Sequence, residues 1–185
     1  MKEIGLVPVI GVDYKSFGES PTMEDKTTTI VIRDNRSVST FAHVVEKKGA
    51  SDRWTVDKNV DDIASLGYTE INLKGDGEPA LIQVMEAVKN KRLHGTRIQN
   101  PPAYDPQSNG AIECAVDHVM GQTRAIKIGL EFRLKGKVNP RLKVMEWIVE
   151  HSCMLINRGQ VGKDGKTPYK RIVGRDNKQS IVEFG

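Results

Sequence analysis

The sequence predicts an α/β domain built on a five-stranded mixed sheet flanked by helices. Three observations support this class. Three strand-like segments follow one another early in the chain, helical and strand-like segments then alternate, and the last part is helical. Strands joined by short turns pair antiparallel, whereas strands joined through a helix pair parallel. The order βββ-α-β-α-β-α therefore predicts an antiparallel meander extended by parallel strands.

The strands are predicted from short apolar or β-branched runs bounded by turn residues. The first run, GLVPVIGVDY, is almost wholly apolar and ends just after an aspartate. The Asp-Asn turn RDNR separates the second strand from the third. The expected strands are 5–14, 27–35, 37–47, 70–76 and 96–100.

The helices are predicted from apolar residues that recur every three or four positions. Gly67 suits the end of the first helix, and Pro79 suits the first turn of the second. Three prolines and a glycine make 101–110 a loop, and we expect Gly121 and Gly129 to bend or divide the long helix after it. The expected helices are 55–67, 79–91, 110–135 and 140–158, followed by a short proline-started turn.

Length and composition fit a single folded domain, with a core over about 5–135 and a helical tail over about 136–176. The 185 residues are 38% hydrophobic and 28% charged, which is typical of soluble globular proteins. No apolar run is long enough to span a membrane. The short apolar start contains Asp13 and lacks a small-residue cleavage site, so we expect no signal peptide and an intracellular location, in the nucleus or cytoplasm.

Cysteine and histidine usage argues against a disulfide framework or a zinc knuckle. There are two cysteines, Cys114 and Cys153, without a CxxC motif, and four histidines without ligand spacing. The net charge is +4, and basic residues gather in 89–97, 124–143 and 162–175. This distribution is compatible with a polyanionic partner, although each cluster alone is more typical of a solvated face.

Three carboxylates are candidates for a shared metal site: Asp13 near the end of the first strand, Asp76 at the end of the fourth, and Glu113 in the first turn of the helix after the stiff loop. The crossover helix is expected to place the fourth strand beside the first, so both aspartates would share one edge of the sheet. Three such carboxylates repel one another, and hard oxygen ligands favour Mg²⁺ or Mn²⁺. Two such ions can clamp an in-line phosphoryl displacement.

Each carboxylate also has an ordinary structural explanation. The chain contains 24 Asp and Glu residues, so three can be chosen after the fact. Asp13 can cap a turn, and Asp76 lies in the turn-like KGDGEP. Glu113 is favoured in a first helical turn by the helix dipole alone.

The same residues carry a resemblance to a known family. GVDYKSFG, LKGDGEPAL and AYDPQSNGAIE resemble the three motifs of retroelement integrase catalytic cores, of the long-terminal-repeat retrotransposon and retroviral type. The last is close to the family pattern Y-x-P-Q-S-N-G-x-x-E. Thirty-six residues lie between Asp76 and Glu113, near the usual thirty-five of that family. The resemblance covers about residues 5–176.

The resemblance implies an RNase H-like fold with a D-D-E triad of Asp13, Asp76 and Glu113 that binds two Mg²⁺ (or Mn²⁺) ions. It implies an integrase-like polynucleotidyl transferase that trims retroelement 3′ ends and joins them to target DNA. Core domains of this family generally dimerise, so a homodimer or a higher assembly is expected. The residues expected to contact nucleic acid are Gln107, Ser108, Asn109, Gly110, Arg124 and Lys127.

The sequence also departs from the family pattern. After the glutamate it reads ECAVDHVM, so that Cys114, Asp117 and Met120 replace basic residues. Asp117 is thereby a fourth acidic candidate. The zinc-binding N-terminal domain and the C-terminal DNA-binding domain of such integrases are not expected in this chain. Two alternatives stay open: a catalytically silent, domesticated core that serves as a nucleic-acid-binding or assembly module, and an RNase H-like nuclease acting on RNA–DNA hybrid.

Overall fold

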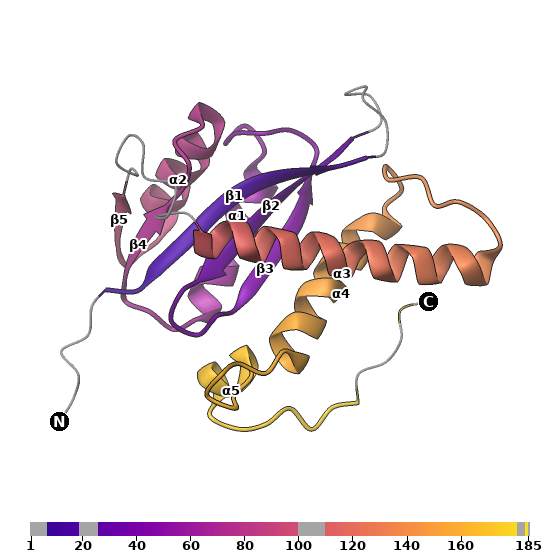
Figure 1. The fold of residues 1–185 in the computed structure, drawn as a ribbon. Helices are drawn as coiled ribbons and strands as arrows, with labels where there is room; N and C mark the ends of the chain where they lie inside the picture. The colour runs from indigo at the N-terminus through magenta and orange to yellow at the C-terminus, as the bar shows by residue number, and fades with distance from the viewer. Residues whose placement is uncertain (1–6, 19–25, 100–109, 181–183, 185) are drawn as a thin grey trace.

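The computed structural model describes residues 7–18, 26–99, 110–180 and 184. Ten helices and strands follow one another in the described residues in the predicted order (Figure 1). The strands are β1 (Val9–Phe17), β2 (Thr27–Asp34), β3 (Thr40–Val45), β4 (Glu70–Lys74) and β5 (Gly95–Gln99). The helices are α1 (Arg53–Ser65), α2 (Pro79–Lys91), α3 (Gly110–Leu134), α4 (Val144–Gly159) and α5 (Pro168–Val173).

The five strands form one mixed sheet in the order β3-β2-β1-β4-β5. β2 pairs antiparallel with both β1 and β3, because short connections join these strands. β4 and β5 are each reached through a helix, and β4 pairs parallel with both β1 and β5. This confirms the predicted mixed α/β sheet, including the placement of the fourth strand beside the first.

One face of the sheet is covered by α1 and α2. Alternate residues of β1 point to this face, where Ile10, Val12 and Tyr14 are buried. They pack in one hydrophobic cluster with apolar residues of both helices, including Val56, Ile63, Leu81 and Met85.

The opposite face is covered by α3 and α4. Val31 of β2 and Ala42 of β3 are buried there against apolar residues of both helices, including Ile112, Val116, Val119 and Val149. The residues of β1 that alternate onto this face are Gly11, Asp13 and Lys15. A charged residue in the middle of β1 therefore faces the side of the sheet on which α3 lies.

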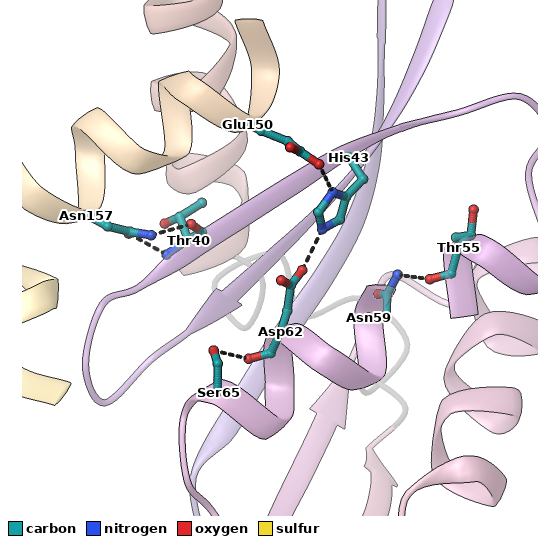
Figure 2. A network of polar contacts seen from close by, with 8 residues as sticks. All are labelled: Thr40, His43, Thr55, Asn59, Asp62, Ser65, Glu150 and Asn157. Atoms are coloured by element: carbon teal, nitrogen blue, oxygen red, sulfur yellow. Dashed lines mark hydrogen bonds and ion pairs between the residues drawn. The ribbon is translucent and has the colours of Figure 1, made fainter. Parts of the chain in front are cut away.

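Helix α4 is tied to the edge strand β3 by polar contacts, as Figure 2 shows. The Asn157 side chain accepts a hydrogen bond from the Thr40 backbone N–H (2.8 Å) and donates one to the Thr40 carbonyl (2.7 Å). The imidazole of His43 lies between two carboxylates, with Nε2 2.6 Å from Asp62 and Nδ1 3.1 Å from Glu150. His43 thus joins β3 to both α1 and α4.

The histidine is buried, so its charge is decided by competing effects. Burial alone lowers the pKa of His43, but the hydrogen bond to Asp62 and the charges of Asp62 and Glu150 outweigh burial and raise this pKa above its ordinary value. The protonated imidazole is therefore the form that the fold favours.

Helix α4 also presents two different sides. Met145, Ile148 and Val149 are buried in the described structure, whereas Trp147 is 66% exposed and Leu142, just before the helix, is 54% exposed. A buried core helix and an exposed apolar surface are therefore both present in this segment. None of the helices in the described ranges has the length and hydropathy needed to cross a bilayer.

Three sequence-based expectations are corrected. β1 continues to Phe17, because Lys15–Phe17 pair with Thr27–Thr29 in a long hairpin, so Asp13 lies in mid-strand and not near its end. α3 runs unbroken through both of its interior glycines, since packing against the sheet and α4 outweighs their low helix propensity. α4 begins at Val144 and not at Pro140.

Candidate active site

Asp13 and Asp76 both follow the last pair of the β1–β4 ladder, Gly11–Lys74, at the same offset of two residues. Asp13 lies within β1. The fourth strand was expected to end at Asp76, but β4 ends at Lys74, so Asp76 lies in the turn before α2. Neighbouring strands lie about 4.8 Å apart, so both aspartates follow closely on one paired level of the sheet.

Glu113 is brought to this level by the packing of α3 on β1. The first turn of α3 contains Ile112, which is buried against the sheet. A methyl group added to Gly11 would lie only 3.0 Å from the Ile112 Cβ, so α3 approaches β1 at the one position without a side chain. Glu113, next along the helix, is exposed beside this contact.

The charges of both Asp76 and Glu113 act on Asp13. Burial raises the pKa of Asp13, and the negative charges of Asp76 and Glu113 raise it further. Two contacts oppose this rise: the Tyr14 N–H donates a 2.7 Å hydrogen bond to Asp13 Oδ1, and Lys15 contributes a positive charge. The balance leaves the ionised form of Asp13 disfavoured.

The turn that carries Asp76 explains the Gly-Asp-Gly sequence. Asp76 Oδ1 accepts a 2.9 Å hydrogen bond from the Glu78 N–H, which fixes the turn before α2. Gly77 has a φ of +88°, in the left-handed region that glycine tolerates best. At Gly75 an added Cβ would lie 2.7 Å from Leu81 Cδ2. The glycines on both sides of Asp76 are therefore explained by local packing and backbone conformation.

The donor set suits a hard divalent cation. Carboxylate oxygens are the ligands that Mg²⁺ and Mn²⁺ prefer, and a cation would offset the repulsion that raises the pKa of Asp13. Within the described ranges, no three His, Cys, Asp or Glu side chains are close enough together to hold a metal ion as they stand. Asp76 and Glu113 are exposed, so their side chains can change rotamer toward Asp13 without disturbing the core.

The structure describes only some of the residues expected to contact nucleic acid, and these differ in exposure and pairing. Gln107, Ser108 and Asn109 lie outside the described residues, and Gly110 is the exposed first residue of α3. Arg124 is exposed on α3, and Lys127 forms a 2.6 Å ion pair with Glu131. The Lys127 hydrogen bond, with a backbone hydrogen bond from Val138 and the charges of Lys127 and Lys137, lowers the pKa of Glu131 to about 2. The pairing partly neutralises Lys127, which weakens Lys127 as a phosphate ligand.

The three residues of α3 that differ from the family pattern lie on different sides of the helix. Cys114 and Asp117 are exposed, and Cys114 Sγ lies 3.8 Å from His118 Nε2. Met120 is 2% exposed and belongs to the cluster between the sheet and α4, where a lysine would have to be desolvated. The charges acting on Asp13 among the described residues come from Asp76, Lys15 and Glu113, and Asp117 contributes none.

Sequence reasoning missed two residues of the site. Lys15 supplies the positive charge nearest in sequence to Asp13, and its two-residue spacing within a strand was a usable signal, because i and i+2 share a face. Gly11 allows α3 to approach β1. No sequence signal distinguishes this role, since it depends on which helix crosses β1 at that point.

Comparison with known proteins gives a match to solved structures alone. No protein-family model and no curated protein matches the chain. The catalytic core domain of BIV integrase is 18% identical, with a TM-score of 0.61 over 90% of this chain and 93% of that chain. The magnesium complex of the HTLV-2 integrase catalytic core domain, in its trimeric form, is 15% identical, with a TM-score of 0.63 over 91% and 99% of the two chains.

A third similar structure belongs to a larger assembly. A chain of the simian T-cell lymphotropic virus intasome, solved in complex with PP2A regulatory subunit B56 gamma, is 19% identical to this chain with a TM-score of 0.68. The match covers 98% of this chain and 60% of that one. At these identities the likeness establishes the fold, which is the RNase H-like fold of integrase catalytic cores.

Proposed function

We propose that the protein is an integrase-like polynucleotidyl transferase that processes the 3′ ends of retroelement DNA and transfers them to target DNA. Asp13, Asp76 and Glu113 would hold the catalytic divalent cations. Two observations support this proposal: Asp13 and Asp76 lie at equal offsets beyond the last pair of the β1–β4 ladder, and the charges of Asp76 and Glu113 both act on Asp13. The fold shared with integrase catalytic cores supports the same assignment.

The roles of the three residues follow from their positions. Asp13 is the half-buried member, held by a backbone hydrogen bond from Tyr14. Asp76 and Glu113 are exposed. Asp76 would bind the ion from the turn before α2, and Glu113 would bind it from the first turn of α3. When bound, Mg²⁺ or Mn²⁺ supplies the positive charge that activates an attacking water or 3′-hydroxyl and stabilises the leaving oxygen of the phosphodiester.

The reaction is tested with purified protein, Mn²⁺ and a branched DNA substrate. The proposal predicts strand breakage and joining by the wild-type chain, lost in Asp76→Asn by a factor of about 10² or more. Asp117→Asn is the matched control, because this exposed carboxylate lies one turn from Glu113 on the same helix. Wild-type breakage no greater than that of Asp76→Asn would contradict the proposal.

A second candidate is a catalytically silent core that serves as a nucleic-acid-binding or assembly module. The exposed Cys114 and Asp117 on α3 favour it, because they replace basic residues of the family pattern. Such a module needs no divalent cation, so nucleic-acid binding that is unchanged by EDTA, with no strand breakage in Mn²⁺, would support it. A preference for cleaving RNA–DNA hybrid over duplex DNA would instead identify an RNase H-like nuclease.

We propose DNA and a second copy of the chain as partners. Two of the similar solved structures are described as dimeric and trimeric forms of an integrase core, and a third is an intasome. In this chain, Trp147 and Leu142 supply exposed apolar area near the start of α4. Sedimentation of the wild type and of Trp147→Glu tests this surface, with a shift toward monomer expected for the variant.

A further inference from the structure

The basic cluster 162–175 is not used by the proposed catalytic site, and the structure shows where it lies. A pocket of roughly 590 Å³ is formed between the turn after β2, the connection from α1 to β4, and the segment around α5. Ten residues line it: Arg36, Ser37, Leu66, Tyr68, Asp164, Lys166, Lys170, Arg171, Ile172 and Gly174. We name this space the basic pocket.

The basic pocket lies at the opposite end of the sheet from the three carboxylates. Tyr68 precedes β4, and the Asn35 N–H donates a hydrogen bond to the carbonyl of Val9, the first residue of β1. The four residues from Val9 to Asp13 span roughly 13 Å along the strand. In Figure 1, α5 is likewise well separated from the first turn of α3. A ligand in this pocket would be distinct from one at the candidate active site.

The lining of the basic pocket is mostly cationic, with four cationic side chains and one carboxylate. Arg171 is held in place: it donates hydrogen bonds of 3.1 and 2.6 Å to the two oxygens of Asp164, and another of 3.1 Å to the Ser37 carbonyl. The buried Asp34 carboxylate accepts a 2.8 Å hydrogen bond from the Tyr68 hydroxyl. Asp164 is matched by Arg171, and Lys166 and Lys170 supply further positive charge in the lining.

The two lysines are the cations most readily available to a ligand. Lys166 is exposed, and within the described part of the chain no carboxylate lies within ion-pair distance of its ammonium. Lys170 Nζ lies 2.9 Å from Asp176, whose side chain is 71% exposed. An exposed pair of this kind contributes little, so a phosphate can replace Asp176 at small cost.

The remaining wall suits a nucleotide better than an acidic peptide. The Arg36 guanidinium lies over the Tyr68 ring, 5.6 Å from its centre, so a cation and an aromatic ring adjoin in this wall. Leu66 and the partly exposed Ile172 add apolar area beside it. Cations beside an aromatic ring match the phosphates and the bases or sugars of a nucleic acid strand.

We propose that the basic pocket binds the phosphate backbone of a nucleic acid strand, as a contact site separate from the three carboxylates. Lys166 and Lys170 would bind the phosphates, and the Arg36–Tyr68 pair would contact a base or sugar. The site adds a second nucleic-acid contact to the chain, and it requires no divalent cation.

The test measures binding of a short labelled single-stranded oligonucleotide to the full chain by fluorescence anisotropy in EDTA. The double variant Lys166→Gln, Lys170→Gln is expected to bind about tenfold more weakly at low salt, with the slope of log affinity against log salt reduced by about one to two. Lys163→Gln is the matched control, because Lys163 is exposed in the same loop but does not line the pocket. It is expected to bind like the wild type.

Equal binding by the wild type and the double variant, or an equal loss in Lys163→Gln, would overturn the proposal. Thermal unfolding at the wild-type temperature shows that the double variant is folded. Tripolyphosphate is expected to displace the oligonucleotide more effectively than polyglutamate at the same charge concentration, and the reverse ranking would indicate an acidic protein segment instead. Asp76→Asn is expected to leave this binding unchanged, so failure of the pocket and failure of the catalytic proposal are separable.

Discussion

Asp13 and Asp76 each lie two residues past the last paired residues of the β1–β4 ladder, Gly11 and Lys74. Beyond that pair, β1 continues as a strand while the chain after β4 turns toward α2. The divergence leaves the second aspartate exposed in a turn and the first half-buried in a strand. Asp13 thus accepts a hydrogen bond from the Tyr14 N–H within a strand, and Asp76 accepts one from the Glu78 N–H within a turn.

The first prediction concerns the contact between β1 and α3. Gly11→Ala places a methyl group 3.0 Å from the Ile112 Cβ, so the first turn of α3 must shift away from the sheet and carry Glu113 with it. We expect a loss of about 1–3 kcal/mol in the free energy of unfolding, typical of overpacking, together with weaker Mn²⁺ binding. Urea unfolding and calorimetry measure the two effects. Wild-type values for both would show that the contact does not position Glu113.

The second prediction concerns a glycine-to-alanine substitution on α3, which is the control for Gly11→Ala. Gly121 is exposed, and a methyl group added there meets nothing within 4 Å. Gly121→Ala is therefore expected to raise the free energy of unfolding by about 0.5–1 kcal/mol, because alanine favours the helix. It is expected to leave metal binding unchanged. Destabilisation would mean that α3 needs a glycine at this point.

The third prediction is a pH dependence of stability that arises from His43. Its pKa in the folded state is raised, so folding favours the protonated imidazole. The contribution is fully present below the ordinary pKa of about 6.5 and is lost as pH rises through the raised folded pKa. Unfolding by urea across this window is expected to show a falling free energy of unfolding.

The control for this prediction is His43→Gln. Glutamine can donate from its amide nitrogen to a carboxylate but cannot become charged. The variant is expected to be less stable than the wild type at pH 6, and the difference is expected to narrow as pH rises. A difference that is constant with pH would rule out the charge of His43 as the cause.

The fourth prediction is that Asp13→Asn stabilises the metal-free fold at neutral pH. Burial and the charges of Asp76 and Glu113 disfavour the ionised carboxylate, and the amide removes that charge while its oxygen keeps the bond from the Tyr14 N–H. Because the folded pKa of Asp13 is raised, its stabilising contribution is present at low pH and lost as pH rises through that pKa. The gain in the free energy of unfolding is therefore expected to be present at pH 7 and to shrink toward pH 3. Destabilisation at pH 7 would contradict it.

Much of the fold was predictable from local signals. Pro79 begins α2, and Gly67 follows the end of α1, so residues with restricted or permissive backbones marked boundaries that packing did not move. The pairing of the first strand with the fourth followed from chain connectivity. The extent of β1 did not, because its last residues become a strand only through pairing with the start of β2.

The candidate site was inferred from expected strand ends, a helix start and a family pattern, and the metal-binding role of Asp13, Asp76 and Glu113 stays a prediction. The sequence did not predict that Lys127 is a weak candidate for binding phosphate. Its ammonium forms an ion pair with Glu131, which competes with a phosphate ligand. The position of Met120 inside the core likewise depends on where α4 packs.

The most direct test of the central claim, that Asp13, Asp76 and Glu113 jointly bind a divalent cation, is a calorimetric titration with Mn²⁺. The wild type is expected to bind, whereas Asp13→Asn, Asp76→Asn and Glu113→Gln should each lose most of that affinity. Asp117→Asn should bind like the wild type, since its carboxylate does not act on Asp13 among the described residues. Undiminished binding by Glu113→Gln, or an equal loss in Asp117→Asn, would contradict the claim.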